Sequence, residues 1–205
     1  MKMAERFHPL VLASASPRRR DLMRQIGLIF DVQPVDIDEI QVPGEAPDLY
    51  VLRMARDKAL QCQALAGNGE SLVLGADTVV VLDGRIMGKP AARDDAASML
   101  RCLSGREHQV MTAVALAGPN AVRERVMTTR VAFRPIKDAE IKAYMDTGEP
   151  FDKAGAYGIQ GRGGIFVTSL HGSYSAVAGI DLEATADLLA QAGRPVAECW
   201  VTGDE

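Results

Sequence analysis

The segment LASASPRRR, residues 12–20, constrains the fold of this chain more than any other stretch. An apolar run ends in two small hydroxyl residues, Ser14 and Ser16, which Pro17 and three arginines follow. Ser16 is of a type typical of a helix N-cap, and Pro17 suits the first helical position, where no N–H is needed. The pattern predicts a buried strand, a tight turn and a helix that ends near Gly27.

The three arginines of this segment carry charge of the wrong sign for the start of a helix. Each exposed cation in a first turn opposes the helix dipole at a cost of about 0.3–1 kcal/mol. A bound polyanion would reverse this cost, because free N–H groups and guanidinium groups both donate to phosphate. We therefore take Arg18 and Arg19 as candidate phosphate ligands, with Ser14 as a neutral donor. The alternative is a solvated basic turn.

The size and charge of the chain limit its class and its partners. With 205 residues it forms one large domain or two small lobes around a shared cleft. The net charge of −4 does not attract nucleic-acid polymers in general. Three widely spaced cysteines without metal-ligand spacing favour a reducing compartment, and no apolar run approaches a membrane span. We expect a cytoplasmic protein without membrane or nucleic-acid polymer partners.

An acidic loop is expected after a second strand over residues 28–35. Asp36, Asp38 and Glu39 place three carboxylates within four residues, which could ligate a hard cation through oxygen. The alternative is a solvated acidic loop.

A long amphipathic helix is predicted over Pro47–Ala66. Lys58 lies seven residues beyond Val51 and four beyond Met54, so it falls on the apolar stripe of this helix. A lysine there either extends its ammonium out of the core or reaches into a cleft toward a negative ligand.

The segment LVLGADTVVVLDGRIMGKP carries the best catalytic candidate. Residues 72–74 and 79–82 are predicted strands, and Asp83-Gly84 is a strong two-residue hairpin turn. Asp77 interrupts the apolar run, and an unpaired buried carboxylate is costly, so it is paired, bound to metal or catalytic. The alternative is an Asp that caps a turn between two strands. The hairpin returns Lys89 toward the strand start, near Asp77, unless Lys89 lies in a surface turn.

The second half of the chain contains a glycine-rich segment at residues 152–164. Its five glycines would let the backbone press against a ligand and leave Tyr157 and Gln160 to read it, although a structural loop is an equal alternative. Helices are also predicted over residues 94–103, 138–147 and 182–191, and strands over residues 109–117, 122–133 and 165–170.

Several of these segments together resemble the Maf family, nearly end to end and in order. They are LASASPRRR, Glu39, Arg56-Asp57-Lys58-Ala59, Gly75-Ala76-Asp77-Thr78, Gly88-Lys89-Pro90, Leu103-Ser104-Gly105 and the segment KAGAYGIQG at residues 153–161. The resemblance implies a single α/β domain over residues 1–205, with a long mixed twisted sheet flanked by helices and two lobes around a central cleft. It also implies a homodimer, and a nucleoside triphosphate pyrophosphatase that uses a divalent cation and releases pyrophosphate and a nucleoside monophosphate.

Two motifs point to one branch of the family. Gly-Ala-Asp-Thr and Tyr-Gly-Ile-Gln-Gly resemble the branch that prefers dTTP and UTP to 7-methyl-GTP. This resemblance implies that Asp77 is the proton acceptor and that Arg18, Thr78 and Gln160 are specificity positions. Modified pyrimidine nucleotides, the 7-methyl-GTP branch and a nucleotide-binding regulator of cell division without turnover remain alternatives.

The expected chemistry distributes roles among these residues. Arg18, Arg19, Lys58 and Lys89 are expected to hold the phosphates, and Glu39 and Asp77 to hold Mg²⁺ or Mn²⁺. A metal-bound Asp77 is a weaker base than a free one, so whether it deprotonates the water or only orients it stays open. The Gln160 amide can accept from N3–H and donate to O4 of uracil or thymine, but the flipped amide would fit cytosine.

Overall fold

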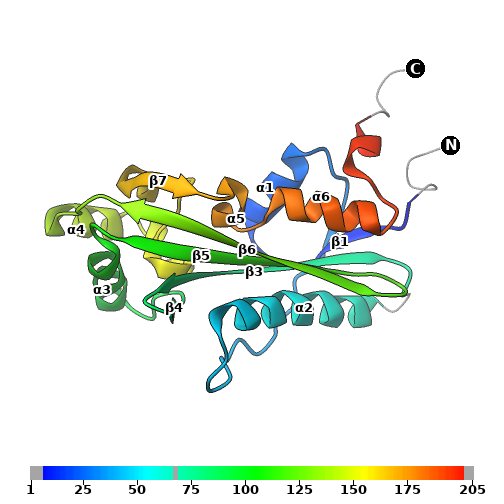
Figure 1. Ribbon diagram of the computed structural model, residues 1–205, viewed down its shortest axis with the longest axis horizontal. Coiled ribbons are helices and arrows are strands. Elements are labelled where there is room, and N and C mark those ends of the chain that lie inside the picture. The colour runs from blue at the N-terminus through cyan, green and yellow to red at the C-terminus, as the bar shows by residue number, and fades with distance from the viewer. Residues whose placement is uncertain (1–6, 67–68, 201–205) are drawn as a thin grey trace. The chain divides into compact units, whose positions relative to one another are not determined.

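The computed structural model describes residues 7–66 and 69–200, and within them seven strands form one mixed sheet (Figure 1). The strands are β1 (Leu10–Leu12), β2 (Asp31–Val32), β3 (Leu72–Leu82), β4 (Arg85–Met87), β5 (Glu107–Ala117), β6 (Val122–Phe133) and β7 (Val167–His171). The helices are α1 (Pro17–Gln25), α2 (Pro47–Ala66), α3 (Arg93–Leu103), α4 (Asp138–Asp146), α5 (Tyr174–Ala178) and α6 (Leu182–Gln191). The strand order is β2-β1-β3-β5-β6-β7, and β4 pairs with β3. The expected α/β class with a mixed sheet and flanking helices is confirmed.

The chain divides into two compact units, each described here by itself. Unit 1 contains residues 1–77, 112–126 and 179–205, and unit 2 contains residues 78–111 and 127–178. No helix in the described part of either unit is long and apolar enough to cross a membrane.

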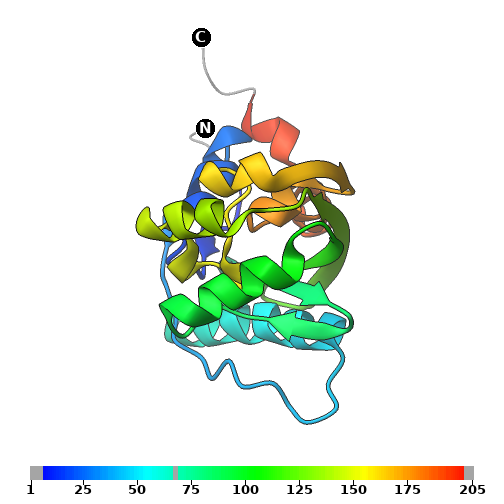
Figure 2. The ribbon, with the colours of Figure 1, turned by 90° about the vertical axis from the view of Figure 1, so that its left-hand side faces the viewer.

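Unit 1 is built around β1, which runs parallel to β2 on one side and to β3 on the other. Helix α2 covers one face of these strands, and α1 and α6 cover the other (Figures 1 and 2). The second strand is much shorter than the predicted residues 28–35. It is the edge strand of the sheet and pairs with the three-residue β1, so the ladder is limited to two residue pairs.

The contact between α2 and β3 brings two backbones close together at Gly75. A Cβ atom at this position would overlap the carbonyl oxygen of Ala55 and would lie 2.8 Å from the amide nitrogen of Ala59. Alternate residues of a strand share one face, so Asp77 points to the same side as Gly75 and therefore toward α2. The glycine thus sets how closely Lys58, next to Ala59 on α2, approaches β3.

Strand β3 is continuous, which corrects the prediction of two strands separated at residues 75–78. The alternative that Asp77 caps a turn is therefore wrong. The carboxylate stays within the strand because an ammonium group from α2 neutralises it, as described below, and no turn is needed to bring it to solvent. The hairpin at Asp83-Gly84 is confirmed, since both residues have positive φ and Leu82 pairs with Arg85.

The start of α1 follows the prediction except for its cap. Ser16 is the N-cap residue and Pro17 the first helical residue, but the Ser16 side chain makes no capping hydrogen bond. Instead, the Ser16 backbone N–H donates to Ser14 Oγ at 3.2 Å. Gly27 follows the helix with φ of +76°, as expected for a residue that ends a helix in the left-handed conformation.

Unit 2 packs α3 and α4 together with the β3–β4 hairpin over an apolar core with a cluster of five aromatic rings. The rings are those of His108, Phe133, Tyr144, Tyr157 and Phe166, arranged edge to face or tilted. Tyr157 is buried here and shares a 2.9 Å hydrogen bond with His108 Nε2. The prediction that Tyr157 reads a ligand is therefore wrong. The first two residues of the predicted strand 165–170 belong to a 3₁₀ turn, so β7 begins at Val167.

Burial of His108 makes folding stability depend on pH. Burial lowers the pKa of His108 from 6.5 to about 4, and Nδ1 has no hydrogen-bond partner among the described residues. Between these pH values the unfolded chain binds a proton that the native chain does not, so stability present above pH 6.5 is lost as the pH falls toward 4. The expected loss is about 3 kcal/mol.

Urea unfolding at several pH values tests this effect. His108→Gln lacks the imidazole, whose protonation is linked to unfolding in this range. The slope of the free energy of unfolding between pH 6.5 and 4 should therefore be smaller than in the wild type by about 1.4 kcal/mol per pH unit. An unchanged slope in the variant would show that other groups account for acid sensitivity.

Candidate active site

The turn between β1 and α1 is organised by Ser14 and Arg19. Ser14 is buried, and its Oγ accepts hydrogen bonds from Arg19 Nη1 and from the Ser16 N–H, each at 3.2 Å. Arg19 Nε donates to the carbonyl oxygen of Gly179 at 2.7 Å. Burial lowers the pKa of Arg19, while the charges of Asp77 and Glu39 raise it, so these two carboxylates lie within electrostatic reach. Both Ser14 and Arg19 are therefore held at the N-terminus of α1, where anions are stabilised. Arg18, the preceding residue of the helix, is half-buried.

Lys58 joins two carboxylates that come from different parts of unit 1. Its Nζ lies 2.7 Å from Asp77 Oδ1 on β3 and 2.7 Å from Glu39 Oε1 in the loop before α2. The side chains of Lys58 and Asp77 are only 11% and 13% exposed, and that of Glu39 is 48% exposed. Lys58 therefore does not extend its ammonium away from the protein into bulk solvent. It lies at a partly buried acidic pair, one carboxylate of which is open to solvent.

The two carboxylates suit a divalent cation that is shared with a ligand. They supply hard oxygen donors, and one cationic atom already contacts both of them. Magnesium is usually held by one or two carboxylates together with substrate phosphates and waters. Among residues 7–66 and 69–200 there is no group of three or more His, Cys, Asp or Glu side chains placed to hold a metal ion. The residues fit a cation bridged to phosphate and do not fit a metal cage made of protein alone.

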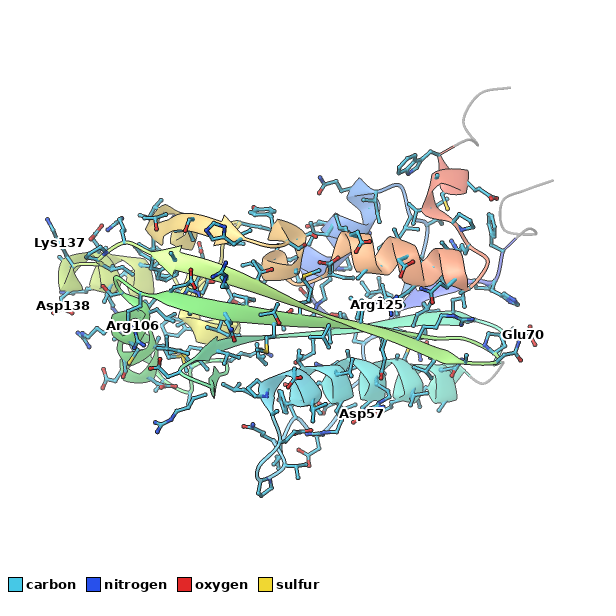
Figure 3. All side chains as sticks on the ribbon, in the orientation of Figure 1. Asp57, Glu70, Arg106, Arg125, Lys137 and Asp138 are labelled. Atoms are coloured by element: carbon cyan, nitrogen blue, oxygen red, sulfur yellow. The ribbon has the colours of Figure 1, made fainter. Side chains whose placement is uncertain are left out.

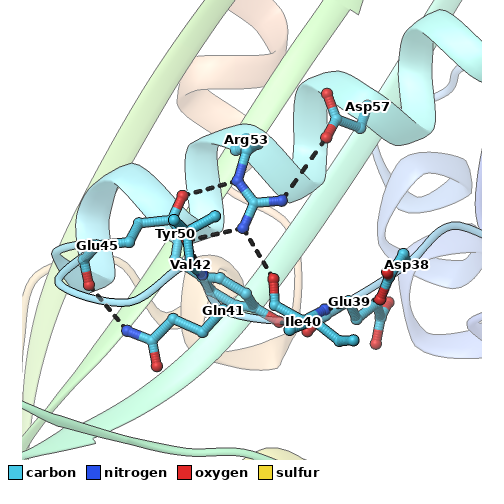
Figure 4. Close-up of polar contacts among 9 residues, drawn as sticks. All are labelled: Asp38, Glu39, Ile40, Gln41, Val42, Glu45, Tyr50, Arg53 and Asp57. Atoms are coloured by element: carbon cyan, nitrogen blue, oxygen red, sulfur yellow. Dashed lines mark hydrogen bonds and ion pairs between the residues drawn. The ribbon is translucent and has the colours of Figure 1, made fainter.

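Tyr50 and Arg53 on α2 contact the loop that carries Glu39, and neither was predicted from the sequence as a site residue. The Tyr50 hydroxyl donates to the Glu39 carbonyl oxygen at 2.8 Å, and burial raises its pKa to about 12. Arg53 contacts the same loop (Figure 4). A signal was present, because Tyr50, Arg53, Asp57 and Gln61 recur at three- and four-residue steps and form one polar stripe on a helix.

Three predicted site residues belong to unit 2. Thr78 is half-buried on β3, Lys89 is exposed after β4, and Gln160 is exposed in the glycine-rich segment.

The glycine-rich segment is wrapped around the side chain of Glu149. Its carboxylate accepts hydrogen bonds from the Tyr144 hydroxyl at 2.8 Å and from the backbone N–H groups of Arg162 and Gly163 at 3.0 and 3.2 Å. A Cβ atom at Gly161 would overlap this carboxylate, and one at Gly163 would lie 2.7 Å from the Tyr144 hydroxyl oxygen. These glycines therefore let the backbone approach protein groups, as the structural alternative in the sequence analysis expected. The Gln160 side chain is exposed.

Comparison with known proteins decides the family. The family model described as Maf-like protein matches residues 9–192, which includes every site residue discussed above. The chain belongs to the Maf family. The segments that carry the resemblance in the sequence are therefore those of a true family member.

Several Maf relatives are about half identical to this chain over nearly all of its length. A protein from Anaeromyxobacter dehalogenans is 52% identical over 91% of this chain and 95% of its own length. One from Colwellia psychrerythraea is 51% identical over 90% and 88%, and one from Bordetella parapertussis is 52% identical over 91% and 94%. All three are named dTTP/UTP pyrophosphatase. A solved HAM1 protein from Coxiella burnetii has a TM-score of 0.42 and 20% identity over 62% of this chain and 73% of that chain.

Proposed function

We propose that this Maf protein is a nucleoside triphosphate pyrophosphatase that hydrolyses dTTP and UTP to the nucleoside monophosphate and pyrophosphate. The observation that carries the proposal is the cluster in which Lys58 joins Asp77 and Glu39, with Arg19 in electrostatic reach at a helix N-terminus. This cluster offers positive charge for a triphosphate and oxygen donors for its counter-ion. The names of the relatives support the same activity and the same two nucleotides.

The reaction requires that the triphosphate is held and that a water is aligned for attack. Arg19 and Lys58 bind phosphate oxygens, with Arg18 and Lys89 as further cations and Ser14 as a neutral donor. Lys58 exchanges its carboxylate partners for phosphate when the nucleotide enters. Asp77 and Glu39 are then free to hold Mg²⁺ or Mn²⁺, which, when bound, neutralises phosphate charge and lowers the pKa of a bound water. Asp77 accepts a hydrogen bond from the attacking water, which orients the water and favours the removal of its proton.

Gln160, Thr78 and Arg18 select the nucleobase. Gln160 is exposed and its amide can accept from N3–H and donate to O4 of thymine or uracil. Thr78 and Arg18 contribute to selection of the base through the shape and charge of the binding site. None of these contacts involves the sugar 2′ position, so both dTTP and UTP are accepted as substrates.

A nucleotide panel tests the proposal. Initial rates of pyrophosphate release are measured with Mn²⁺ for dTTP, UTP, CTP, ATP, GTP and 7-methyl-GTP. We expect dTTP and UTP to be hydrolysed fastest. Fastest turnover of 7-methyl-GTP would assign the chain to the other branch, and tight nucleotide binding without product would contradict an enzymatic role.

Gln160→Ala tests the selection of the base. Loss of the amide contacts should lower kcat/KM for dTTP and UTP by about 1–3 kcal/mol of transition-state binding, which is roughly 5- to 150-fold. Rates with poor substrates such as ATP should change little, because they do not use these contacts. An unchanged preference in the panel would remove Gln160 from the role of reading the base.

The surroundings of the enzyme are part of the same proposal. Its partner is the small nucleotide rather than a nucleic-acid polymer or a membrane, and it acts in the cytoplasm as a homodimer. Modified pyrimidine nucleotides are an additional substrate class to include in the panel.

A further inference from the structure

The loop formed by residues 33–46, called the acidic loop here, is held against α2 by polar contacts. Gln61 Nε2 donates to the carbonyl oxygen of Asp36 at 3.1 Å, and Tyr50 and Arg53 contact the loop further along. Around Glu39 the apolar side chains of the loop give little anchoring, because Ile40 and Val42 are 72% and 53% exposed, whereas Val35 and Ile37 nearer its start are half-buried. The loop follows the side of α2 that faces away from the sheet (Figure 2). Side chains of the loop and of α2 line a cavity of about 540 Å³ between them. Its conformation therefore depends on hydrogen bonds and ion pairs.

Arg53 makes the strongest of these contacts (Figure 4). Its Nε and Nη2 atoms each lie 2.7 Å from one carboxylate oxygen of Glu45, in a two-pronged pair. The same Nη2 also donates to the carbonyl oxygen of Ile40 at 3.1 Å. The Glu45 side chain is only 11% exposed, and its second oxygen also accepts the Val42 N–H at 3.1 Å. Arg53 and Glu45 thus close the loop between residues 40 and 45.

The contacts made by α2 extend to Glu39, the loop residue whose carboxylate pairs with Lys58. Tyr50 holds the carbonyl oxygen of Glu39, and Arg53 holds that of Ile40. With two consecutive carbonyl groups fixed, the peptide plane between residues 39 and 40 has one orientation. The Glu39 side chain then leaves the backbone toward Lys58, where its Oε1 lies 2.7 Å from Nζ.

We propose that Arg53 and Glu45 are positioning residues that hold the Glu39 carboxylate beside Asp77, and that this pair sets the affinity of the enzyme for its divalent cation. The inference rests on the proposed function, since it assigns Glu39 to the cation. Neither residue contacts the reacting atoms. Residues that orient metal ligands typically change metal affinity by 10- to 100-fold when they are replaced.

Arg53 has a second carboxylate partner, which provides a matched control. Asp57 lies one turn further along α2, and its Oδ2 is 4.0 Å from Arg53 Nη1. Asp57 lies on the helix itself (Figure 3), so its contact does not restrain the acidic loop. Glu45→Gln and Asp57→Asn each remove a negative charge that contacts Arg53, but only Glu45→Gln releases the loop.

The test measures Mn²⁺ binding directly, by the electron paramagnetic resonance signal of free Mn²⁺, in the presence of a non-hydrolysable dTTP analogue. Glu45→Gln should raise the dissociation constant for Mn²⁺ about tenfold or more. Arg53→Lys, which keeps the charge but loses the two-pronged geometry, should raise it similarly. Asp57→Asn should leave it within about twofold of the wild type, as expected for an exposed pair.

Turnover gives an independent readout. In Glu45→Gln the Mn²⁺ concentration for half-maximal activity should rise, while kcat at saturating Mn²⁺ returns to within about threefold of the wild type, because the reacting groups are intact. An unchanged Mn²⁺ affinity in both Glu45→Gln and Arg53→Lys would overturn the proposal, and so would an equal loss in Asp57→Asn. If the wild type binds Mn²⁺ with the analogue but does not hydrolyse dTTP, the proposed function fails. The Mn²⁺ dissociation constants of the variants still test the positioning roles of Arg53 and Glu45.

Discussion

Asp77→Asn is expected to lower kcat for dTTP hydrolysis by about 10²- to 10⁴-fold, the range typical of a lost general base. The amide has the shape of the carboxylate and can still accept a hydrogen bond from Lys58, so the variant should fold. It lacks the negative charge that Asp77 supplies to the cation and to the attacking water. Steady-state rates at saturating dTTP and Mn²⁺ measure the effect.

The matched control for this variant is Asp83→Asn. Asp83 lies in the hairpin turn with φ of +50°, a conformation that Asn also adopts readily, and it pairs with Arg106 in unit 2. Its kcat should equal that of the wild type. If Asp77→Asn kept more than a tenth of the wild-type kcat, Asp77 would be a structural partner of Lys58 and not a catalytic residue.

Gly75→Ala is expected to have the largest effect on stability. The added methyl group would overlap the Ala55 carbonyl oxygen and lie 2.8 Å from the Ala59 nitrogen, and both of these are backbone atoms that cannot rotate away. Helix α2 must therefore shift away from β3. We expect the free energy of unfolding to fall by about 3 kcal/mol, which lowers Tm by roughly 6–12 °C for a domain of this size.

Gly75→Ala is expected to change the site as well as the stability of the protein. Displacement of α2 moves Lys58 away from Asp77, so folded Gly75→Ala protein should also bind a dTTP analogue more weakly. Gly88→Ala is the control, because Gly88 has an ordinary φ and a Cβ atom there meets no atom within 4 Å. Its Tm should change by no more than about 2 °C. Equal Tm values for the two variants would show that the close approach at Gly75 does not limit stability.

The sequence predicts most helices of this fold well because their signals are local. The bounds of α2 and α6 agree with the prediction, since each carries an apolar stripe and a marked end. Asp181 caps α6, accepting the Ala184 N–H at 2.7 Å. The strand–turn–helix at residues 10–25 also follows from its own residues.

Features that depend on distant partners were not predictable in this way. Asp77 looked like a break in a strand because its neutralising partner, Lys58, comes from another element. Tyr157 looked available to a ligand because its hydrogen-bond partner, His108, lies far away in the sequence on β5. The glycine-rich segment surrounds Glu149, which lies outside the motif. In each case the pattern indicated the residue types, and tertiary contacts decided their use.

In the candidate site, too, some residues were predictable from local sequence and others depend on tertiary contacts. Residue type and spacing singled out Glu39, Lys58 and Asp77, and the structure brings these three together in unit 1. The supports of Glu39 were missed, because the polar stripe that contains Tyr50 and Arg53 does not by itself show that these side chains bind backbone carbonyl groups of the loop.

Product analysis tests the central claim most directly. The wild-type protein is incubated with dTTP and Mn²⁺, and the phosphorus species are followed by ³¹P nuclear magnetic resonance. Cleavage between the α and β phosphates predicts dTMP and pyrophosphate in equal amounts, with no dTDP. Formation of dTDP and inorganic phosphate, or intact dTTP after prolonged incubation, would contradict the account.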